Sequence, residues 1–137
     1  MTKLILGIAV AVLIAFGVGW AGGASGKEDI RRALQIAEIR DGLLEGRGAV
    51  LDARLDVYSV NFGDASRHLE AARSALRAAD GRLNALGRQE DAKRLTLALT
   101  RIDEAQQLAG KLNQDANAVA ADAAKTINEV LGSTSTR

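Results

Sequence analysis

The feature that most constrains this chain is an uninterrupted apolar run close to its N-terminus. No charged residue occurs from Leu4 to Gly26, and Leu4–Ala21 reads LILGIAVAVLIAFGVGWA. An α-helix of this length rises about 27 Å, close to the roughly 30 Å thickness of a bilayer's hydrocarbon core. Trp20 stands near one end, where an indole ring prefers the headgroup level. The run predicts a single transmembrane helix within residues 1–22, in contact with membrane lipid.

A cleaved signal peptide is the competing interpretation. The short Met1-Thr2-Lys3 start suits one, and Gly19-Trp20-Ala21 resembles a weak cleavage site. The apolar run, however, exceeds the roughly 7–15 residues of a typical signal-peptide core. We therefore favour an anchor that stays attached.

Small residues recur every fourth position along this anchor. Gly7, Ala11, Ala15 and Gly19 would form a ridge on one helix face, and such ridges let membrane helices approach closely. The ridge predicts packing against other membrane protein subunits. The alternative is that Gly and Ala are simply frequent in membrane helices.

Charged residues on the two sides of the apolar run favour opposite orientations of the anchor in the membrane. The short N-terminal tail with its single Lys3 favours a domain on the outer or periplasmic side of the cell membrane. Lys27, Arg31, Arg32 and Arg40 follow the apolar run, and the positive-inside rule would keep them in the cytoplasm. We favour the outer side.

The remainder of the chain has the composition of a neutral helical domain. After residue 23 it carries 17 acidic and 17 basic residues, and the whole chain has no proline and no cysteine. Balanced charge argues against nucleic acid as a partner. The absence of cysteine excludes disulfides and thiolate metal sites. Abundant Ala, Leu, Arg and Glu favour long helices.

Glycines and capping residues divide this domain. A small-residue hinge at 23–26 precedes helices expected at 27–61, 64–86 and 90–131, followed by a flexible tail at 132–137. Gly63 is expected to cap the first helix and Asp64 to begin the second, while Gly87 ends it and Gly132 ends the third. The predicted fold is all-α: a transmembrane helix, then an extramembrane antiparallel bundle of about three long helices with coiled-coil-like packing in residues 27–131.

Apolar residues alternate by four and three along the second and third stretches, as in a coiled coil or antiparallel bundle. The second series is Ala65, Leu69, Ala72, Leu76, Ala79, Leu83 and Leu86; the third is Leu95, Ala98, Ile102, Ala105, Ala109, Leu112, Ala116, Val119, Ala123, Thr126 and Val130.

The first stretch differs because it has two apolar faces. One contains Leu34, Ala37, Asp41, Leu44, Gly48, Leu51, Leu55 and Tyr58, and the other contains Ile36, Ile39, Leu43, Gly46, Val50, Ala53, Val57 and Val60. The offset of two residues is about 200°, so the faces are nearly opposite. Either the other helices sandwich this one, or one face awaits a partner. Glycines at 42, 46 and 48 also predict a kink or break within 42–48.

Seven residues are candidates for partner binding on these grounds. Leu97 and Leu108 lie on one line of the third stretch, away from its main series, and form either a minor contact to the first helix or an exposed patch. The full candidate set is Ile36, Ile39, Leu43, Val50, Val57, Leu97 and Leu108.

The segment from Leu55 to Leu76 resembles one tetratricopeptide-type helical hairpin. Leu55, Phe62-Gly63-Asp64, Leu69 and Ala75-Leu76 carry the resemblance, while Asp52, Asp56 and His68 depart from the pattern. The resemblance implies helix-turn-helix geometry and not an array of repeats.

No constellation for catalysis, metal or cofactor binding is visible. The one histidine, His68, has no Glu-x-x-His partner, and no serine near it sits in a nucleophile motif. We therefore expect a chain that is not an enzyme, with no cofactor and no metal. Asp41, which interrupts one apolar face, is expected to reach water beside Gly42.

Two functional hypotheses follow. The first is an accessory or structural subunit that docks on and stabilises a larger membrane complex, such as a photosynthetic, respiratory or transport assembly. The alternative is a membrane-tethered helical adaptor or sensor domain that binds a soluble partner. Both are analogies at the level of architecture.

Overall fold

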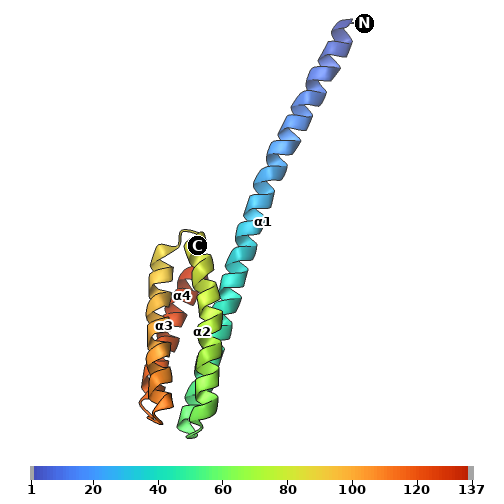
Figure 1. Ribbon diagram of the computed structural model, residues 1–137. Coiled ribbons are helices and arrows are strands. Elements are labelled where there is room, and N and C mark those ends of the chain that lie inside the picture. Colours follow the sequence, from blue (N-terminus) through green and yellow to red (C-terminus); the bar gives the residue numbers. More distant parts are fainter. Residues whose placement is uncertain (1, 136–137) are drawn as a thin grey trace. The chain divides into compact units, whose positions relative to one another are not determined.

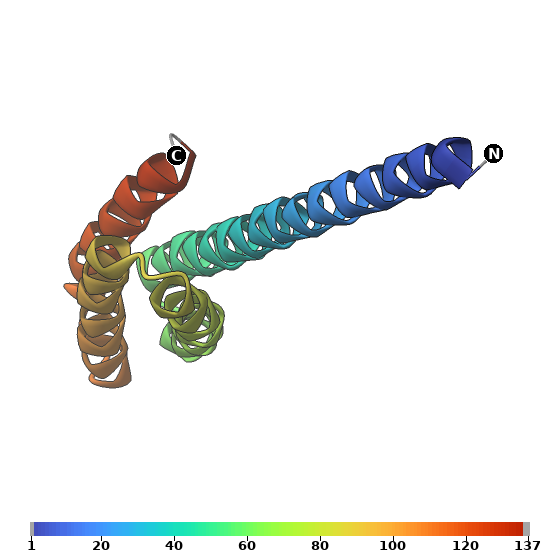
Figure 2. The same ribbon diagram turned by 90° about the horizontal axis from the view of Figure 1, so that it is seen from above.

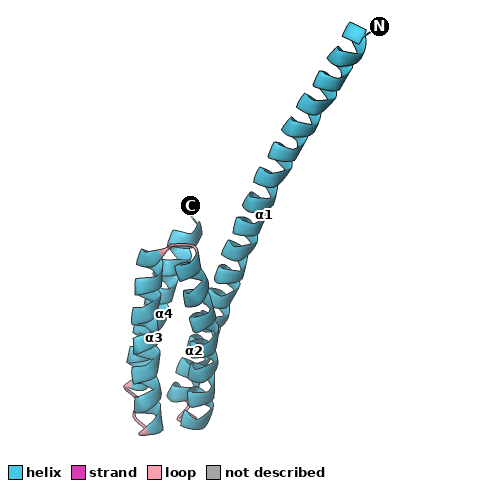
Figure 3. Ribbon diagram, turned by 45° about the horizontal axis from the view of Figure 1, so that its top comes forward, coloured by secondary structure: helices cyan, strands magenta, loops and turns pink. Residues whose placement is uncertain are grey.

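The structure is a computed structural model that describes the backbone of residues 2–135 and the side chains of residues 26–135. The described part of the chain is built from helices. These helices are α1 (Thr2–Tyr58), α2 (Phe62–Ala85), α3 (Gln89–Gly110) and α4 (Ala116–Ser135) (Figure 1). Figure 3 shows helices joined by short loops. The all-α class is thereby confirmed. The chain divides into two compact units, Met1–Gln35 and Ile36–Arg137.

The first unit contains the early part of α1. The predicted span Leu4–Ala21 and most of the 23–26 hinge lie outside the residues whose side chains are described. The bounds of α1 include both segments. Over the described residues, no helix combines the length and apolar character needed to cross a membrane.

The second unit is an antiparallel bundle of the 36–58 part of α1 with α2, α3 and α4. Cross-helix contacts give the pairing: Glu38 with Arg82 between α1 and α2, Arg73 with Asp103 between α2 and α3, and Arg54 with Asn117 between α1 and α4. Viewed from above, α2 lies beside α3 and α3 beside α4 (Figure 2). The first and last helices thus close the bundle.

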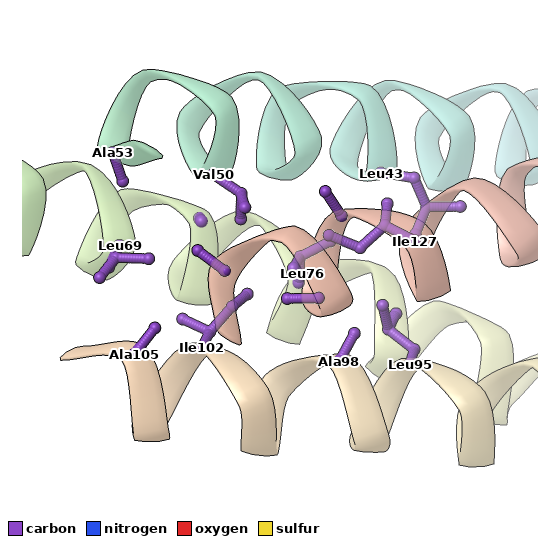
Figure 4. Packing of buried hydrophobic residues seen from close by; sticks show 14 of the residues in the cluster. Leu43, Val50, Ala53, Leu69, Leu76, Leu95, Ala98, Ile102, Ala105 and Ile127 are labelled. Atoms are coloured by element: carbon purple, nitrogen blue, oxygen red, sulfur yellow. The ribbon is translucent and has the colours of Figure 1, made fainter. Parts of the chain in front are cut away.

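One apolar core fills the centre of this bundle. Leu43 and Val50 of α1, Leu76 of α2, Ile102 of α3 and Ile127 of α4 all point into it (Figure 4). About half of the buried apolar residues are alanines. Small core residues allow close helix approach but bury little area each. The bundle prediction is confirmed, with four helices where about three were expected.

The predicted break at 42–48 is wrong, and two of the three glycines there serve packing. A Cβ added at Gly46 would lie 2.5 Å from Leu76 Cγ, and one at Gly42 would lie 3.3 Å from the Ala75 carbonyl oxygen. Both glycines therefore let α2 approach α1, and the helix continues to Tyr58.

The turn between α1 and α2 is formed by Val60 and Asn61, where Gly63 and Asp64 were expected. Val60 adopts a left-handed φ of 61° after α1 ends. Asn61 caps α2, its side-chain oxygen accepting from the backbone N–H of Asp64, so Gly63 lies inside α2. The helical hairpin itself agrees with the tetratricopeptide-like geometry. At the second turn, Gly87 has φ 71° after α2, as predicted.

The predicted third helix is two helices. α3 ends at Gly110, Leu112 takes φ 56°, and the Asn113 side chain accepts from the Asp115 N–H at 2.9 Å before α4 begins. The apolar series changes register across this turn, since Ala120 and Ile127 are buried where Val119 and Thr126 were expected. The polar run Asn113-Gln114-Asp115 was the turn signal that the continuous apolar spacing concealed.

The end of α4 also departs from prediction. Gly132 does not stop the helix, which runs to Ser135, and residues 136–137 lie outside the described part. Ser133 Oγ lies 2.6 Å from Asp91 Oδ1, and Arg88 contacts both Asp91 and the Ser133 carbonyl. Asp91 is only 5% exposed. This hydrogen-bonded cluster fastens the end of α4 to the start of α3, so 132–135 belong to the bundle and not to a tail.

Candidate partner-binding surface

Five predicted site residues belong to the apolar N-terminal segment. Gly7, Ala11, Ala15, Gly19 and Trp20 lie outside the residues whose side chains are described. Their predicted roles in helix packing and at the membrane interface stay predictions.

The predicted partner face of α1 is the core face of the bundle. Ile39, Leu43, Val50 and Val57 are at most 1% exposed, and Ile36, at the start of the same face, is half-buried. These side chains pack against the chain's own helices, so they offer no free surface. The assignment of partner binding to this face is corrected: the other helices cover it.

The opposite face of α1 is open. Leu44 is 48% exposed, Leu55 is 66% exposed and Tyr58 is 81% exposed, while Leu51 is half-buried between them. Single exposed apolar residues are ordinary. A row of them on one face of one helix is the feature that marks an interaction surface. We call Ala37, Asp41, Leu44, Gly48, Leu51, Leu55 and Tyr58 the outer stripe.

The outer stripe ends in a cleft at the α1–α4 boundary. The cleft has a volume of about 330 Å³ and is lined by Leu51, Arg54, Leu55, Tyr58 and Asn117. Arg54 Nε donates to Asn117 Oδ1 at 3.0 Å, and the Asn117 amide donates to the Arg54 carbonyl at 3.3 Å. Reciprocal hydrogen bonds hold this wall in place, so the cleft is a firm continuation of the stripe.

Leu97 and Leu108 do not share a surface. Leu97 is 63% exposed and lines a shallow α3–α4 groove of about 260 Å³, together with Arg101, Asp122 and Lys125 among others. Leu108 is half-buried and packs against the core. Leu97 alone therefore remains a candidate for contact with a partner.

Several charged groups of the bundle form pairs between or within its helices. His68 Nδ1 lies 2.7 Å from Asp56 Oδ2, across the α1–α2 turn. On the α2–α3 side, a hydrogen bond from Arg73 lowers the pKa of the Glu70 carboxyl, and the same bond raises the pKa of Arg73. No group of three metal-ligating side chains occurs within the described residues.

The comparisons with known proteins add no relative. No family model matches the chain. No curated protein and no solved structure matches it either.

Both faces of α1 were visible in the sequence, but partner binding was assigned to the face that the bundle covers. The interrupted face, with Asp41 and Gly48 in it, is the exposed one. The large apolar residues Ile39, Leu43 and Val50, with no charged residue among the members of their face, were the available signal for the core.

Proposed function

We propose that this chain is a non-enzymatic, single-pass membrane protein that acts as an accessory or structural subunit through protein–protein contacts. Its N-terminal apolar run anchors it, and its helical bundle presents the outer stripe for association. The observation that carries the proposal is this stripe, with Leu55 and Tyr58 mostly exposed on a helix whose other face is fully used.

The membrane part of the proposal rests on the amino-acid sequence. Residues 4–26 carry no charge over a length that suits a bilayer. The charged and hydrogen-bonded surface of the bundle suits water, which supports an extramembrane position for residues 36–135. We place the bundle on the outer side, following the single-lysine N-terminal tail.

The test is membrane retention of the full chain with an internal control. The wild-type chain should stay in membranes washed with alkaline carbonate. A Leu13→Arg, Ile14→Arg variant should be released, because each charge at the centre of a span costs about 2.5–3.5 kcal/mol. Release of the wild-type chain would contradict the anchor.

The side of the membrane and the partner are tested separately. The chain has no cysteine, so Ser74→Cys on the exposed part of α2 gives one site for a membrane-impermeant thiol reagent. Labelling of intact cells supports the outer side, and labelling only after lysis contradicts it. Purification in mild detergent should retain membrane partners in fixed ratio.

A tethered adaptor that binds a soluble partner is the second candidate. The exposed Leu97 in the α3–α4 groove favours it, since this surface is separate from the outer stripe. Leu97→Asp should then abolish capture of the soluble partner, whereas Leu55→Asp should leave that capture intact.

A further inference from the structure

The outer stripe has the spacing of a coiled-coil seam. Its seven residues from Ala37 to Tyr58 alternate by four and three without exception, and in sequence the same spacing extends back to Leu34 and Ile30. In heptad terms Asp41, Gly48 and Leu55 take position a, and Ala37, Leu44, Leu51 and Tyr58 take position d. A seam of this kind is completed by another helix running along α1.

Charged residues flank this seam with one sign on each side. Each a residue is directly preceded by an arginine, and each d residue except Tyr58 is directly followed by an acidic residue. The arginines at position g are Arg40, Arg47 and Arg54; the acidic residues at position e are Glu38, Glu45 and Asp52. The stripe therefore has a basic edge and an acidic edge.

This pattern distinguishes between the two orientations of a second copy. In a parallel pair, a g residue faces the e residue five positions later in the other chain, so Arg40 meets Glu45 and Arg47 meets Asp52. In an antiparallel pair, g faces g and e faces e, so arginines would oppose arginines. Attraction in one arrangement and repulsion in the other specify the parallel one.

The charged side chains that would pair in the parallel arrangement form no ion pair inside the described bundle. Glu45 and Asp52 are exposed and form no ion pair within the described residues. Arg47 is half-buried and forms no ion pair within those residues, and its buried Nε has no hydrogen-bond partner there. Arg40 donates from one terminal nitrogen to Ser135 and keeps its other donors.

The flanking charges without a role in the pair are satisfied inside the bundle. Glu38, whose register partner would be the uncharged Ala33, lies 3.2 Å from Arg82. Arg54, whose register partner would be Ser59, donates to Asn117. The flanking charges that a parallel pair would use are thus the ones without an ion pair in the bundle, and this agreement supports a second copy of the chain as the partner of the outer stripe.

We propose that two copies of this chain associate in parallel along the outer stripe, with Arg40 facing Glu45 and Arg47 facing Asp52 across the seam. The inference rests on the proposed function, because anchors in one bilayer present the stripes in parallel and at high effective concentration. Gly48, where an added Cβ would meet nothing within 4 Å, lets the helices approach. Asp41 at position a faces Asp41 of the other copy, and repulsion between these like charges weakens the pair.

Cysteine cross-linking of the full chain tests the orientation. Single variants Ala37→Cys and Leu55→Cys, in phosphatidylcholine vesicles at low protein-to-lipid ratio, should each form a covalent homodimer on mild oxidation. Ser74→Cys, on the outer side of α2, is the matched control and should stay monomeric. Cross-linking only when the Ala37 and Leu55 variants are mixed would show an antiparallel pair and overturn the proposal.

Charge reversal tests the specificity of the seam. Glu45→Arg with Asp52→Arg makes both edges basic, and Arg40→Glu with Arg47→Glu makes the stretch acidic. Each double variant alone should dimerise about tenfold more weakly, because several surface ion pairs become repulsive. An equal mixture of the two variants should recover the wild-type affinity. Unchanged helical circular dichroism shows that folding is retained, and an unaffected dimer would overturn the proposal.

The outcomes separate this inference from the proposed function. A chain that resists carbonate and retains membrane partners yet is monomeric by mass overturns the parallel pair alone. A chain released by carbonate overturns the membrane function, whatever its oligomeric state.

Discussion

The two faces of α1 have similar apolar spacing, but one is buried in the bundle and the other is exposed. On the core face, Leu43 is fully buried, and on the outer face its neighbour Leu44 is 48% exposed. The core face has large residues or close-packing glycines at every turn, whereas the outer face contains a charge at Asp41 and an open glycine at Gly48. Periodicity therefore marks a surface for helix contact, and the residues within it decide whether that contact is permanent.

The largest expected difference is between the two adjacent leucines. Leu43→Ala should lower the free energy of unfolding by about 2–5 kcal/mol, because it leaves a cavity in a packed core. Leu44→Ala should lower it by less than about 1 kcal/mol, because half of its side chain is already in water. Urea unfolding of the full chain in mild detergent, at a dilution where two copies rarely share a micelle, measures both. Equal losses would contradict the separation of the two faces.

The glycines provide a smaller contrast with opposite signs. Gly46→Ala should destabilise the bundle by about 1–3 kcal/mol, since the new Cβ overlaps Leu76. Gly48→Ala should stabilise it by up to about 1 kcal/mol, because alanine favours the helix and nothing stands within 4 Å. Thermal unfolding followed by circular dichroism reports both. A stabilising Gly46→Ala would show that α2 approaches less closely than described.

The smallest expected effect on the free energy of unfolding comes from the ion pair of Glu70 and Arg73 on α2, away from both faces of α1. It shows how much one surface charge pair contributes. The Arg73 hydrogen bond lowers the pKa of Glu70 in the folded chain. Its stabilising contribution is therefore present above the ordinary carboxyl pKa and is lost as pH falls through the lower folded value. Glu70→Gln should remove this part of the acid dependence of unfolding. Identical pH profiles for both chains would contradict the pairing.

The sequence was enough to predict the helical class, the antiparallel packing and the members of most core series. Two features escaped it for physical reasons. The α3–α4 turn is formed by Leu112 in a left-handed conformation, which residue identity does not favour. The break at 42–48 was expected from the low intrinsic helix propensity of glycine, which the packing of α2 against Gly42 and Gly46 overrides.

The candidate surface was predictable only in part. Both faces of α1 were visible as spacing, but covering one of them required a fourth helix that the continuous 90–131 series concealed. Once α4 packs beside α1, at Arg54 and Asn117, the core face is satisfied and the outer stripe remains.

Closure between the first and last helices has a consequence for synthesis on the ribosome. α1 is translated before the other three helices, yet its contacts at Arg54 and Arg40 wait for α4, the last of the four. Until then α2 covers only part of the apolar core face of α1, and the rest is open to mispairing or to chaperones. Folding of this bundle is thus coupled to synthesis of α4, and premature stops before α4 should yield products that cells degrade.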